Sequence, residues 1–304
     1  MTQPPLPPVA ESLLLLASAL DSQRFPACTL YVVATPIGNI ADISARALQV
    51  LMVADAIACE DTRNTAQLLG RYGIKSTLFS AHQHNEREVT LKIIQRLQAG
   101  ERIVLISDAG TPAVSDPGAH IVHAVRAAGL QVVPIPGASA AITALSAAGM
   151  GSDQFHFVGF LPAKPRQRDL QLQALKAGKA TLVMYEAPHR IMETVKALAR
   201  LFGPQREIVI ARELTKLFEQ LHRCALSDAE SWLSADPNRQ RGEFVLLIEG
   251  ETAESDDDAE TRRILNILLE ACPLSQAAAL TARITGMKKN VLYEMALDLE
   301  RDKP

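Results

Sequence analysis

Short apolar segments alternate with longer segments of helical periodicity over the first half of the chain. Apolar runs at residues 30–34, 56–58, 103–106 and 132–134 are typical of buried strands. The segments between them place apolar residues on one helical face, as residues 88–97 do with Val89, Ile93 and Leu97. Because strand and helix alternate, we predict a mainly parallel sheet covered by helices.

The same alternation predicts a second α/β unit after a small-residue helix at residues 138–148. Its strand candidates are residues 155–159, 181–185, 207–211 and 244–249, and its clearest helix covers residues 188–201. We therefore divide this part of the chain into an N-terminal extension at residues 1–28, a first α/β domain at 29–149 and a second at 150–250.

Charge and periodicity change again after the second unit. Residues 251–260 contain six acidic residues and no basic one, which is typical of a solvated linker. Helical segments at residues 261–271, 274–285 and 288–299 then predict a small helical domain at 261–304. Residues 275–297 have the pattern of a helix–turn–helix, with Gly286 at the turn. Such a helix pair can cap the body of the protein or bind nucleic acid, and both alternatives stay open.

Composition excludes several classes of protein. A chain of 304 residues with net charge −3 is long enough for two domains and is not basic throughout, so RNA contacts would need local cationic patches. The cysteines, at positions 28, 59, 224 and 272, lack metal-site or redox spacing, and we expect reduced thiols in the cytoplasm. The apolar run near residues 13–20 is too short to cross a bilayer and follows no basic residue, so we expect neither a membrane span nor a secretory signal.

Two loops that follow predicted strands are suited to binding a ligand. Residues 35–39 read Thr-Pro-Ile-Gly-Asn, and residues 107–112 read Ser-Asp-Ala-Gly-Thr-Pro. Ligands of open α/β sheets bind beyond the carboxyl ends of the strands, where small residues let them approach the backbone. Neither loop has the spaced glycines of a dinucleotide site or the Gly-Lys-Ser/Thr of a phosphate loop. Taken alone, the second loop could be a tight turn in which Asp108 is a capping residue.

Six segments in this order resemble those of the ribosomal RNA small subunit methyltransferase I family, over roughly residues 29–300. They are residues 35–39, Glu60-Asp61-Thr62-Arg63, His84-Asn85-Glu86, residues 107–112, Phe160-Leu161-Pro162-Ala163-Lys164 and Ala211-Arg212-Glu213-Leu214-Thr215-Lys216. The chain departs from the family at Ala34 and Ala138, where proline is common.

The resemblance implies a two-domain tetrapyrrole-methylase-like (class III) α/β methyltransferase fold with a small C-terminal helical domain. It also implies S-adenosylmethionine-dependent methylation of a cytidine ribose 2′-hydroxyl in 16S rRNA, in the decoding region of the small ribosomal subunit, by a cytoplasmic homodimer.

In this fold group S-adenosylmethionine lies in the cleft between the two α/β domains. The contacts that the resemblance implies follow strands or tight turns, and most of them are small. They are Pro36, Asp108, Ala109, Gly110, Ala113, Ser139, Ala140, Glu186 and Leu214.

Methyl transfer to a ribose hydroxyl is an in-line displacement that depends on positioning and is helped by a base. The candidates for this base are Glu60, Asp61 and Lys216, followed by Glu213 and His84. Asp61 could instead cap a helix. Arg63 and Arg212 could pair with carboxylates or hold a phosphate. We expect no metal, because His82 and His84 lack a third ligand.

RNA contact is expected from local cations. Lys164, Arg166 and Arg168 lie within five residues of each other and are interpreted as a mobile basic loop at the mouth of the second domain. Three such charges are also common on a solvated surface. Lys288 and Lys289, at the start of the last helix, are further candidates, and Arg71 and Lys75 are weaker ones.

Two other functions remain open at this point. A methyltransferase of the same fold could act on a tetrapyrrole, although such enzymes carry a Gly-Gly-Asp-Pro-type loop where this chain has residues 107–112 and lack its helical tail. The chain could also be a non-catalytic RNA-binding assembly factor, against which the small-residue loops argue.

Overall fold

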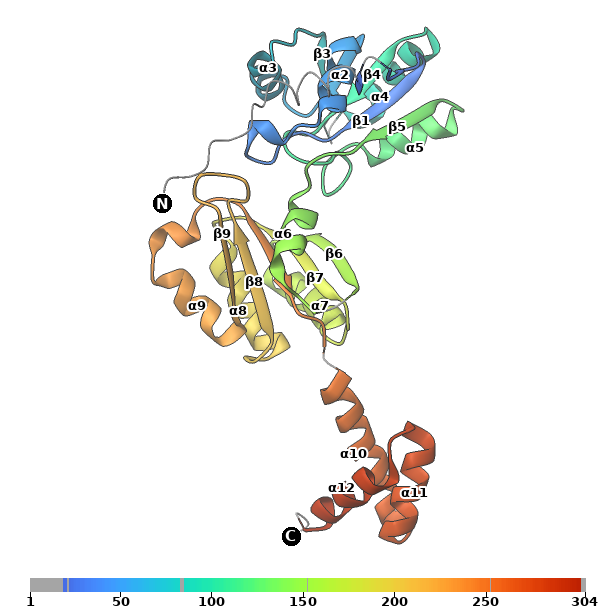
Figure 1. The fold of residues 1–304 in the computed structure, drawn as a ribbon, viewed down its shortest axis with the longest axis vertical. Helices are drawn as coiled ribbons and strands as arrows, with labels where there is room; N and C mark the ends of the chain where they lie inside the picture. The colour runs from blue at the N-terminus through green and yellow to red at the C-terminus, as the bar shows by residue number, and fades with distance from the viewer. Residues whose placement is uncertain (1–18, 21, 83–84, 152, 252, 302–304) are drawn as a thin grey trace.

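Two α/β domains and a C-terminal group of helices follow one another along the chain (Figure 1). The computed structural model describes residues 19–20, 22–82, 85–151, 153–251 and 253–301. The first domain lies at one end of the molecule, the second in the middle and the helices at the other end. The predicted fold class is confirmed.

The first domain contains a parallel five-stranded sheet with the order β3-β2-β4-β1-β5. The strands are β1 (Thr29–Val33), β2 (Ala56–Cys59), β3 (Leu78–Ser80), β4 (Arg102–Leu105) and β5 (Gln131–Ile135). The helices are η1 (Ile40–Asp42), α2 (Ala45–Val53), α3 (Thr62–Arg71), α4 (Glu86–Gln98) and α5 (Ala119–Ala127). Neighbouring strand residues face opposite sides, so Tyr31 packs with α2 and α3 while Leu30 packs with α4 and α5. This arrangement confirms the parallel sheet that the apolar runs predict.

The second domain contains a mixed five-stranded sheet with the order β6-β7-β10-β8-β9. Its strands are β6 (Phe155–Phe160), β7 (Thr181–Glu186), β8 (Glu207–Arg212), β9 (Gln220–Ala225) and β10 (Phe244–Ile248). β6 and β7 are parallel, and the other neighbours are antiparallel. The helical elements are α7 (Pro165–Leu175), α8 (Ile191–Phe202), α9 (Leu226–Ser234) and η2 (Pro237–Gln240). The helix α6 (Ala140–Ala148), which we placed at the end of the first domain, also packs on this sheet.

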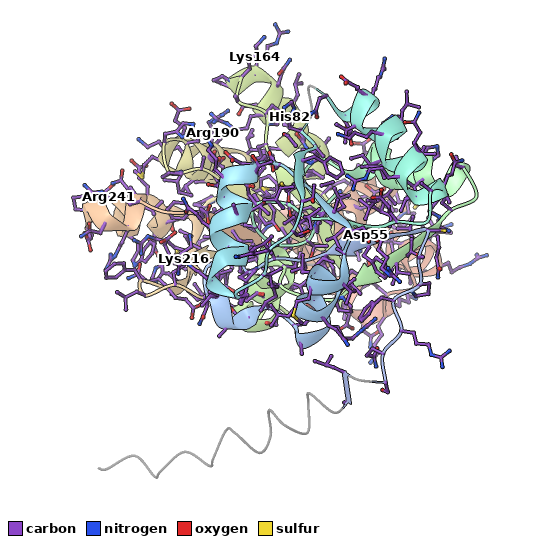
Figure 2. The ribbon with its side chains drawn as sticks, turned by 90° about the horizontal axis from the view of Figure 1, so that it is seen from above. Asp55, His82, Lys164, Arg190, Lys216 and Arg241 are labelled. Atoms are coloured by element: carbon purple, nitrogen blue, oxygen red, sulfur yellow. The ribbon has the colours of Figure 1, made fainter. Side chains whose placement is uncertain are left out.

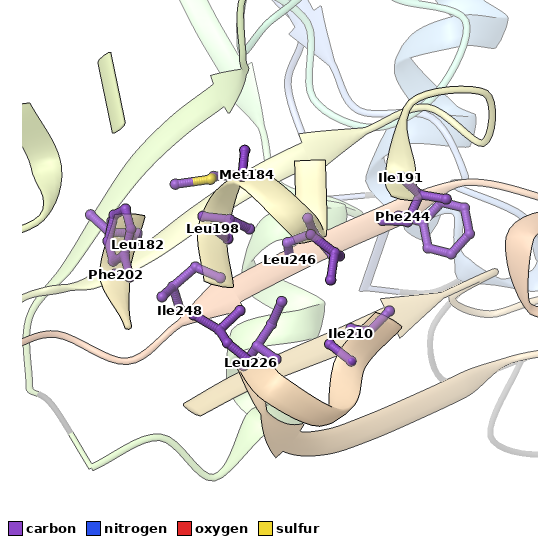
Figure 3. Close-up of a cluster of buried hydrophobic side chains, with 14 of the residues drawn as sticks. Leu182, Met184, Ile191, Leu198, Phe202, Ile210, Leu226, Phe244, Leu246 and Ile248 are labelled. Atoms are coloured by element: carbon purple, nitrogen blue, oxygen red, sulfur yellow. The ribbon is translucent and has the colours of Figure 1, made fainter. Parts of the chain in front are cut away.

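Different helices pack on the two faces of the second sheet. Leu182, Met184 and Leu246 belong to the cluster that packs against α7, α8 and α9 (Figure 3). Val183 and Val245, one residue along, belong to the cluster on α6. The side chains that α6 directs to the sheet are mainly alanines, so this helix can pack closely against the sheet.

Two edge strands were not predicted from the sequence. β3 has three residues, all half-buried, and β9 is largely polar with no buried position. An edge strand is hydrogen-bonded on one side only and can stay exposed, so neither produces the apolar run used to find the buried strands.

The helix α10 (Ala253–Ala271) begins inside the segment that we predicted to be a linker. Acidic residues are favourable at a helix N-terminus, so the charge run that indicated a linker is also compatible with the first turns of this helix. With α11 (Leu274–Thr285) and α12 (Lys289–Arg301) it forms a separate small core around Leu265, Ala277 and Ala296. In the part of the chain that the structure describes, the three helices pack on one another and lie apart from both sheets (Figure 1). Among the described residues, no helix is both long and apolar enough to cross a bilayer.

The described end of the N-terminal extension packs on the first domain. Leu20 accepts a hydrogen bond from Gln49 at 2.9 Å through its carbonyl oxygen, and Phe25 accepts one from Arg102 at 2.8 Å. The Phe25 ring lies edge-on to Tyr31 at 5.8 Å. Residues 1–18 lie outside the described residues.

Replacing Gly250 with alanine should lower the free energy of unfolding by about 1–3 kcal/mol, the usual cost of overpacking. A Cβ atom there would overlap the backbone carbonyl of Lys179, which cannot move aside as a flexible side chain could. Gly151→Ala is the control, because its Cβ would have open space, and it should change stability by less than about 0.5 kcal/mol. Urea unfolding measures both, and equal midpoints would contradict the expectation.

Candidate functional site

A cavity of about 360 Å³ lies where loops of the two α/β domains meet. This size is typical of a small-molecule site. The lining residues are Ile37, Ala109, Gly110, Thr111, Val114, Ser115, Asp116, Ser139 and Ala140 from the first domain and its connection to α6, and Phe160, Tyr185, Glu186, Ala187, Pro188, Leu214, Glu243, Phe244 and Val245 from the second. Most of this surface is apolar or backbone, so a ligand would meet few charged side chains.

The two loops singled out in the sequence lie side by side in the first domain. Thr35 and Gly110 exchange backbone hydrogen bonds of 2.9 and 3.0 Å, and the Thr35 hydroxyl donates to the carbonyl oxygen of Ser107 at 3.1 Å. Gly110 has φ +78°, a left-handed conformation that favours glycine. These contacts bring the loop after β1 and the loop after β4 to one wall of the cavity.

Six of the nine predicted cofactor residues line the cavity: Ala109, Gly110, Ser139, Ala140, Glu186 and Leu214. Pro36 and Ala113 are one residue away from lining positions and are not among the lining residues. Asp108 accepts hydrogen bonds from the Asn64 side chain at 2.9 Å and from the Asp61 amide at 3.3 Å. Asp108 therefore fastens the central loop to the start of α3, which is a contact between distant segments that neither the cofactor prediction nor the turn-capping alternative describes.

Asp61 is the N-cap of α3. Its carboxylate accepts from the Arg63 backbone amide at 2.7 Å and forms an ion pair with the Arg63 side chain at 3.2 Å. These bonds, the Arg63 side chain first, hold the pKa of Asp61 below its usual value. Because the end of the helix and Arg63 stabilise the ionised carboxylate, Asp61 is poorly suited to accept a proton from a substrate.

Lys216 is held by two carboxylates. Its Nζ donates to Glu213 at 2.9 Å and to Glu243 at 2.8 Å. Burial alone would lower the pKa of this ammonium, but the hydrogen bonds to Glu243 and Glu213 raise it above the usual value. The side chain stays protonated at neutral pH and cannot serve as a base there, and Glu213, its partner, is equally engaged.

Glu60 and Asp116 are the carboxyl groups whose environments favour the protonated form. Burial raises the pKa of Asp116, and the charge of Asp108 adds to it, while a hydrogen bond with Ser107 partly offsets the rise. Burial also raises the pKa of Glu60, which lies within electrostatic reach of Asp108 and Asp116. Of the two, Asp116 lines the cavity. Asp116 is followed by proline and glycine, a sequence typical of a turn, so the sequence alone did not identify Asp116 as a site residue.

The carboxylate of Glu186 is almost fully buried and has structural partners. It accepts from the Thr194 hydroxyl at 2.6 Å and from the Ala187 amide at 2.8 Å, and it pairs with Arg190 at 3.2 Å. Arg190 also donates to the Leu161 carbonyl oxygen at 2.7 Å. Arg190 thus joins the loop after β6 to the loop after β7. Glu186 supports this wall of the cavity by holding Arg190 in place.

The loop after β8 joins the two domains at the cavity. The Asn39 amide of the first domain donates to the Thr215 hydroxyl at 3.0 Å. A Cβ atom on Gly38 would come within 2.5 Å of Lys216, so this close approach needs glycine. Arg212 is buried and donates to the carbonyl oxygens of Arg241 and Phe218, at 2.7 and 3.1 Å. Arg212 therefore shapes this loop and is not free to hold a phosphate.

The prediction of a mobile basic loop at residues 164–168 is wrong. Lys164 is the N-cap of α7, Pro165 occupies the first helical position, and Arg166 and Arg168 lie in the helix. Arg168 is only 5% exposed and contacts Glu193 at 3.5 Å, because the helical turn directs it to the body of the domain. Lys164 and Arg166 are exposed, and Figure 2 shows Lys164 at the periphery of the molecule.

The remaining predicted residues do not converge on the cavity. Lys288 and Lys289 are exposed at the start of α12, in the helical domain at the far end of the molecule. Arg71 and Lys75 are exposed on the first domain. His84 lies outside the described residues. No group of three potential metal ligands occurs among the residues that the structure describes.

Comparisons with known proteins agree with this architecture. Residues 29–230 match the family model "Tetrapyrrole (Corrin/Porphyrin) Methylases", and residues 255–300 match "RsmI C-terminal HTH domain". The chain is 50% identical to "Ribosomal RNA small subunit methyltransferase I" of Pseudomonas aeruginosa over 272 residues, covering 88% of this chain and 96% of the relative. It is 48% identical to the protein of that name from Escherichia coli O157:H7 over 270 residues, 88% and 94% of the two chains.

A solved structure with the same fold contains a bound ligand. It is the uroporphyrin-III C-methyltransferase of Thermus thermophilus complexed with S-adenosylhomocysteine, which is 18% identical with a TM-score of 0.52. The match covers 73% of this chain and 97% of that one. At this identity the likeness concerns the fold alone.

Proposed function

Because the chain belongs to the ribosomal RNA small subunit methyltransferase I family, we propose that it transfers a methyl group from S-adenosylmethionine to the 2′-hydroxyl of a cytidine ribose in 16S rRNA. The observation that carries this proposal is the cavity between the two α/β domains. Its position beyond the carboxyl ends of β1 and β4 is where a doubly covered parallel sheet binds ligands. The decoding region and the cytidine are expectations from the family resemblance.

The residues of the cavity suit S-adenosylmethionine. About 360 Å³ is enough for a ligand of nucleoside size. Ala109, Gly110, Ser139 and Ala140 expose backbone groups without bulky side chains, so ribose and amino-acid groups could meet amides and carbonyls directly. When bound, S-adenosylmethionine supplies a methyl group on a positively charged sulfur. The carboxyl groups near the cavity are compatible with that charge.

We assign the role of general base to Asp116. Of the carboxyl groups that line the cavity, Glu186 is committed to Arg190 and Thr194, and Glu243 is paired with Lys216. Among the residues that the structure describes Asp116 forms no ion pair, and its raised pKa makes it a better proton acceptor than an ordinary aspartate. Glu60, a candidate from the sequence that lies within electrostatic reach of Asp116 and whose pKa is also raised by burial, is the alternative. In this proposal Asp116 accepts the proton of the ribose hydroxyl, while the loops hold the hydroxyl oxygen in line and exclude water.

RNA of the small subunit is the proposed substrate, and the helical domain supports this choice over a tetrapyrrole. The α10–α12 group is matched by a helix–turn–helix model. Its α12 begins with two exposed lysines that could contact phosphates. Such contacts would add to those made by the exposed Lys164 and Arg166 at the start of α7.

Mass mapping of ribose methylation tests the proposal. The 16S rRNA of a strain lacking the gene should lose one ribose methyl group, and the purified protein with S-adenosylmethionine should restore it on the assembled subunit or on naked RNA. Methylation of uroporphyrinogen with none of rRNA would favour the tetrapyrrole alternative. Binding of RNA without any turnover would favour the assembly factor.

Replacing Lys164 and Arg166 with alanine should weaken RNA binding and reduce its dependence on salt. Each lost phosphate contact should lower the log–log salt slope by roughly 0.7–0.9. Arg168→Ala is the comparison, because this side chain is buried and cannot reach RNA; it should reduce stability and leave the slope unchanged. Filter binding of a 16S rRNA fragment at several salt concentrations measures the slopes. A double variant with the wild-type slope would assign both residues to the solvated surface.

A homodimer and a cytoplasmic location also stay proposals. Large apolar side chains are exposed on the second domain, among them Ile142, Leu217 and Phe218. A second copy of the chain could cover them, and light scattering would measure the assembly.

A further inference from the structure

Phe160 exposes an aromatic ring at the cavity. The residue is the last of β6, lines the cavity and is 54% exposed. Single exposed apolar residues are ordinary on protein surfaces. The feature that sets this one apart is that a local distortion of the backbone directs it to the site.

A β-bulge in β6 determines where Phe160 points. In a regular strand, residues three positions apart face opposite sides of the sheet. Here the pairing with β7 shifts between Phe157 and Gly159, so Phe160 comes opposite Tyr185. As a result both Phe157 and Phe160 pack edge-on against the Tyr185 ring, at 5.1 and 5.5 Å. Bulges next to active sites commonly redirect a side chain in this way.

The bulge depends on glycine and contacts the cavity loop of the first domain. Gly159 has φ +71°, and a Cβ atom on it would lie 2.7 Å from the Ser115 hydroxyl oxygen. Ser115 is itself a lining residue. The distortion therefore places Phe160 where the second domain meets the loop that carries Asp116.

The ring has a firm support. The Tyr185 hydroxyl oxygen accepts a hydrogen bond from the Ala141 amide at the start of α6, at 3.3 Å. On the other side of Phe160, the carbonyl oxygen of Leu161 accepts from Arg190 at 2.7 Å. With Tyr185 and the following backbone both fixed, the exposed ring is held ready for a ligand, which lowers the entropy lost on binding.

We propose that Phe160 is the stacking surface for the base of the nucleotide that is methylated. This inference rests on the proposed function and adds the conformation of the substrate: the target nucleotide must be unpaired and turned out of its helix, because a paired base has no free face for the ring. Aromatic rings are the usual partners of unstacked RNA bases. A base on Phe160 would place its own ribose at the cavity, close to the loop of Asp116, and the exposed Lys164 four residues further on could hold the neighbouring phosphate.

The experiment compares Phe160→Leu with Phe155→Leu. Phe155 is the first residue of the same strand, is 47% exposed and does not line the cavity. Both variants make the same chemical change in the same strand, but only Phe160→Leu makes it at the cavity. Loss of one base–aromatic stack should raise KM for RNA about 5- to 100-fold in Phe160→Leu. Phe155→Leu should match the wild type, and Phe160→Trp should stay within about threefold of it. Calorimetric titration of S-adenosylmethionine should give the same Kd for all four proteins.

A fluorescent cytidine analogue, pyrrolocytidine, placed at the mapped methylation position reports stacking without turnover. Its emission should be quenched by wild type and Phe160→Trp and not by Phe160→Leu. Equal KM values and equal quenching in Phe160→Leu and Phe155→Leu would overturn the inference while leaving wild-type methylation intact. A weaker Kd for S-adenosylmethionine in Phe160→Leu alone would overturn it too, by assigning the ring to the methyl donor. Absence of RNA methylation by the wild type would instead refute the proposed function.

Discussion

Replacing Gly110 with leucine should abolish binding of S-adenosylmethionine while the protein stays folded. Gly110 lines the cavity, and its amide and carbonyl are used in the bridge to Thr35. A side chain at this position would start among Ile37 and the Ala138 carbonyl, at 3.4 and 3.7 Å, and would occupy the space meant for the ligand. We expect Kd to rise at least 100-fold, equivalent to about 2.7 kcal/mol, in calorimetric titration.

Gly73→Leu is the matched control for backbone strain. Gly73 has φ +71°, close to the +78° of Gly110, but its Cβ would meet nothing within 4 Å. Both variants should lose about 1–2 kcal/mol of stability, because a leucine pays for the left-handed conformation at either place. If Gly110→Leu bound S-adenosylmethionine as well as Gly73→Leu does, the cavity would not be the methyl-donor site.

Replacing Asp116 with asparagine should lower kcat by about 10²- to 10⁴-fold, the usual contribution of a general base. Asparagine keeps the size of the side chain but cannot accept the hydroxyl proton. The rate of the wild-type enzyme should fall as the pH drops through the pKa of this carboxyl. Burial raises that pKa, so the acid limb should lie above the range of an ordinary aspartate, and Asp116→Asn should lack it.

Two further variants separate Asp116 from its neighbours. Glu60→Gln should have a smaller effect on kcat and should keep the acid limb, because the neighbouring charge that raises the pKa of Asp116 is that of Asp108. Asp61→Asn should leave kcat almost unchanged, because asparagine is an equally good helix cap. Single-turnover methylation of a 16S rRNA fragment measures all three. A full loss of kcat in Glu60→Gln, with activity retained in Asp116→Asn, would transfer the role to Glu60.

The central strands of the first sheet were predictable because they are buried on both faces. Strands β1, β2 and β4 are covered on both faces and therefore consist of continuous apolar residues. The loops that follow β1 and β4 were placed at the site because parallel strands end at one edge of a sheet. The short edge strand β3 and the largely polar edge strand β9 have no such signal and become strands only because a neighbour is present to pair with them.

The site residues that the sequence missed depend on contacts between distant segments. Asp116 reads as part of a turn, and its partial burial beside the loop of Ser107 and Asp108 arises only in the folded domain. Phe160 reads as the first residue after the predicted strand at 155–159, and the bulge that redirects it requires the pairing with β7. Arg168 is the opposite case. As part of a basic cluster it was predicted to be exposed, but its position on the helix α7 directs it towards Glu193.

The division of the cavity between two domains has a thermodynamic consequence. Each sheet has its own hydrophobic clusters, and at the cavity the two meet through loops such as those of Gly38 and Thr215. A ligand that touches both walls stabilises the closed arrangement by an amount that grows with its concentration relative to Kd. In the proposed function S-adenosylmethionine is such a ligand, so its concentration relative to Kd would set how strongly it stabilises the contact between the two domains.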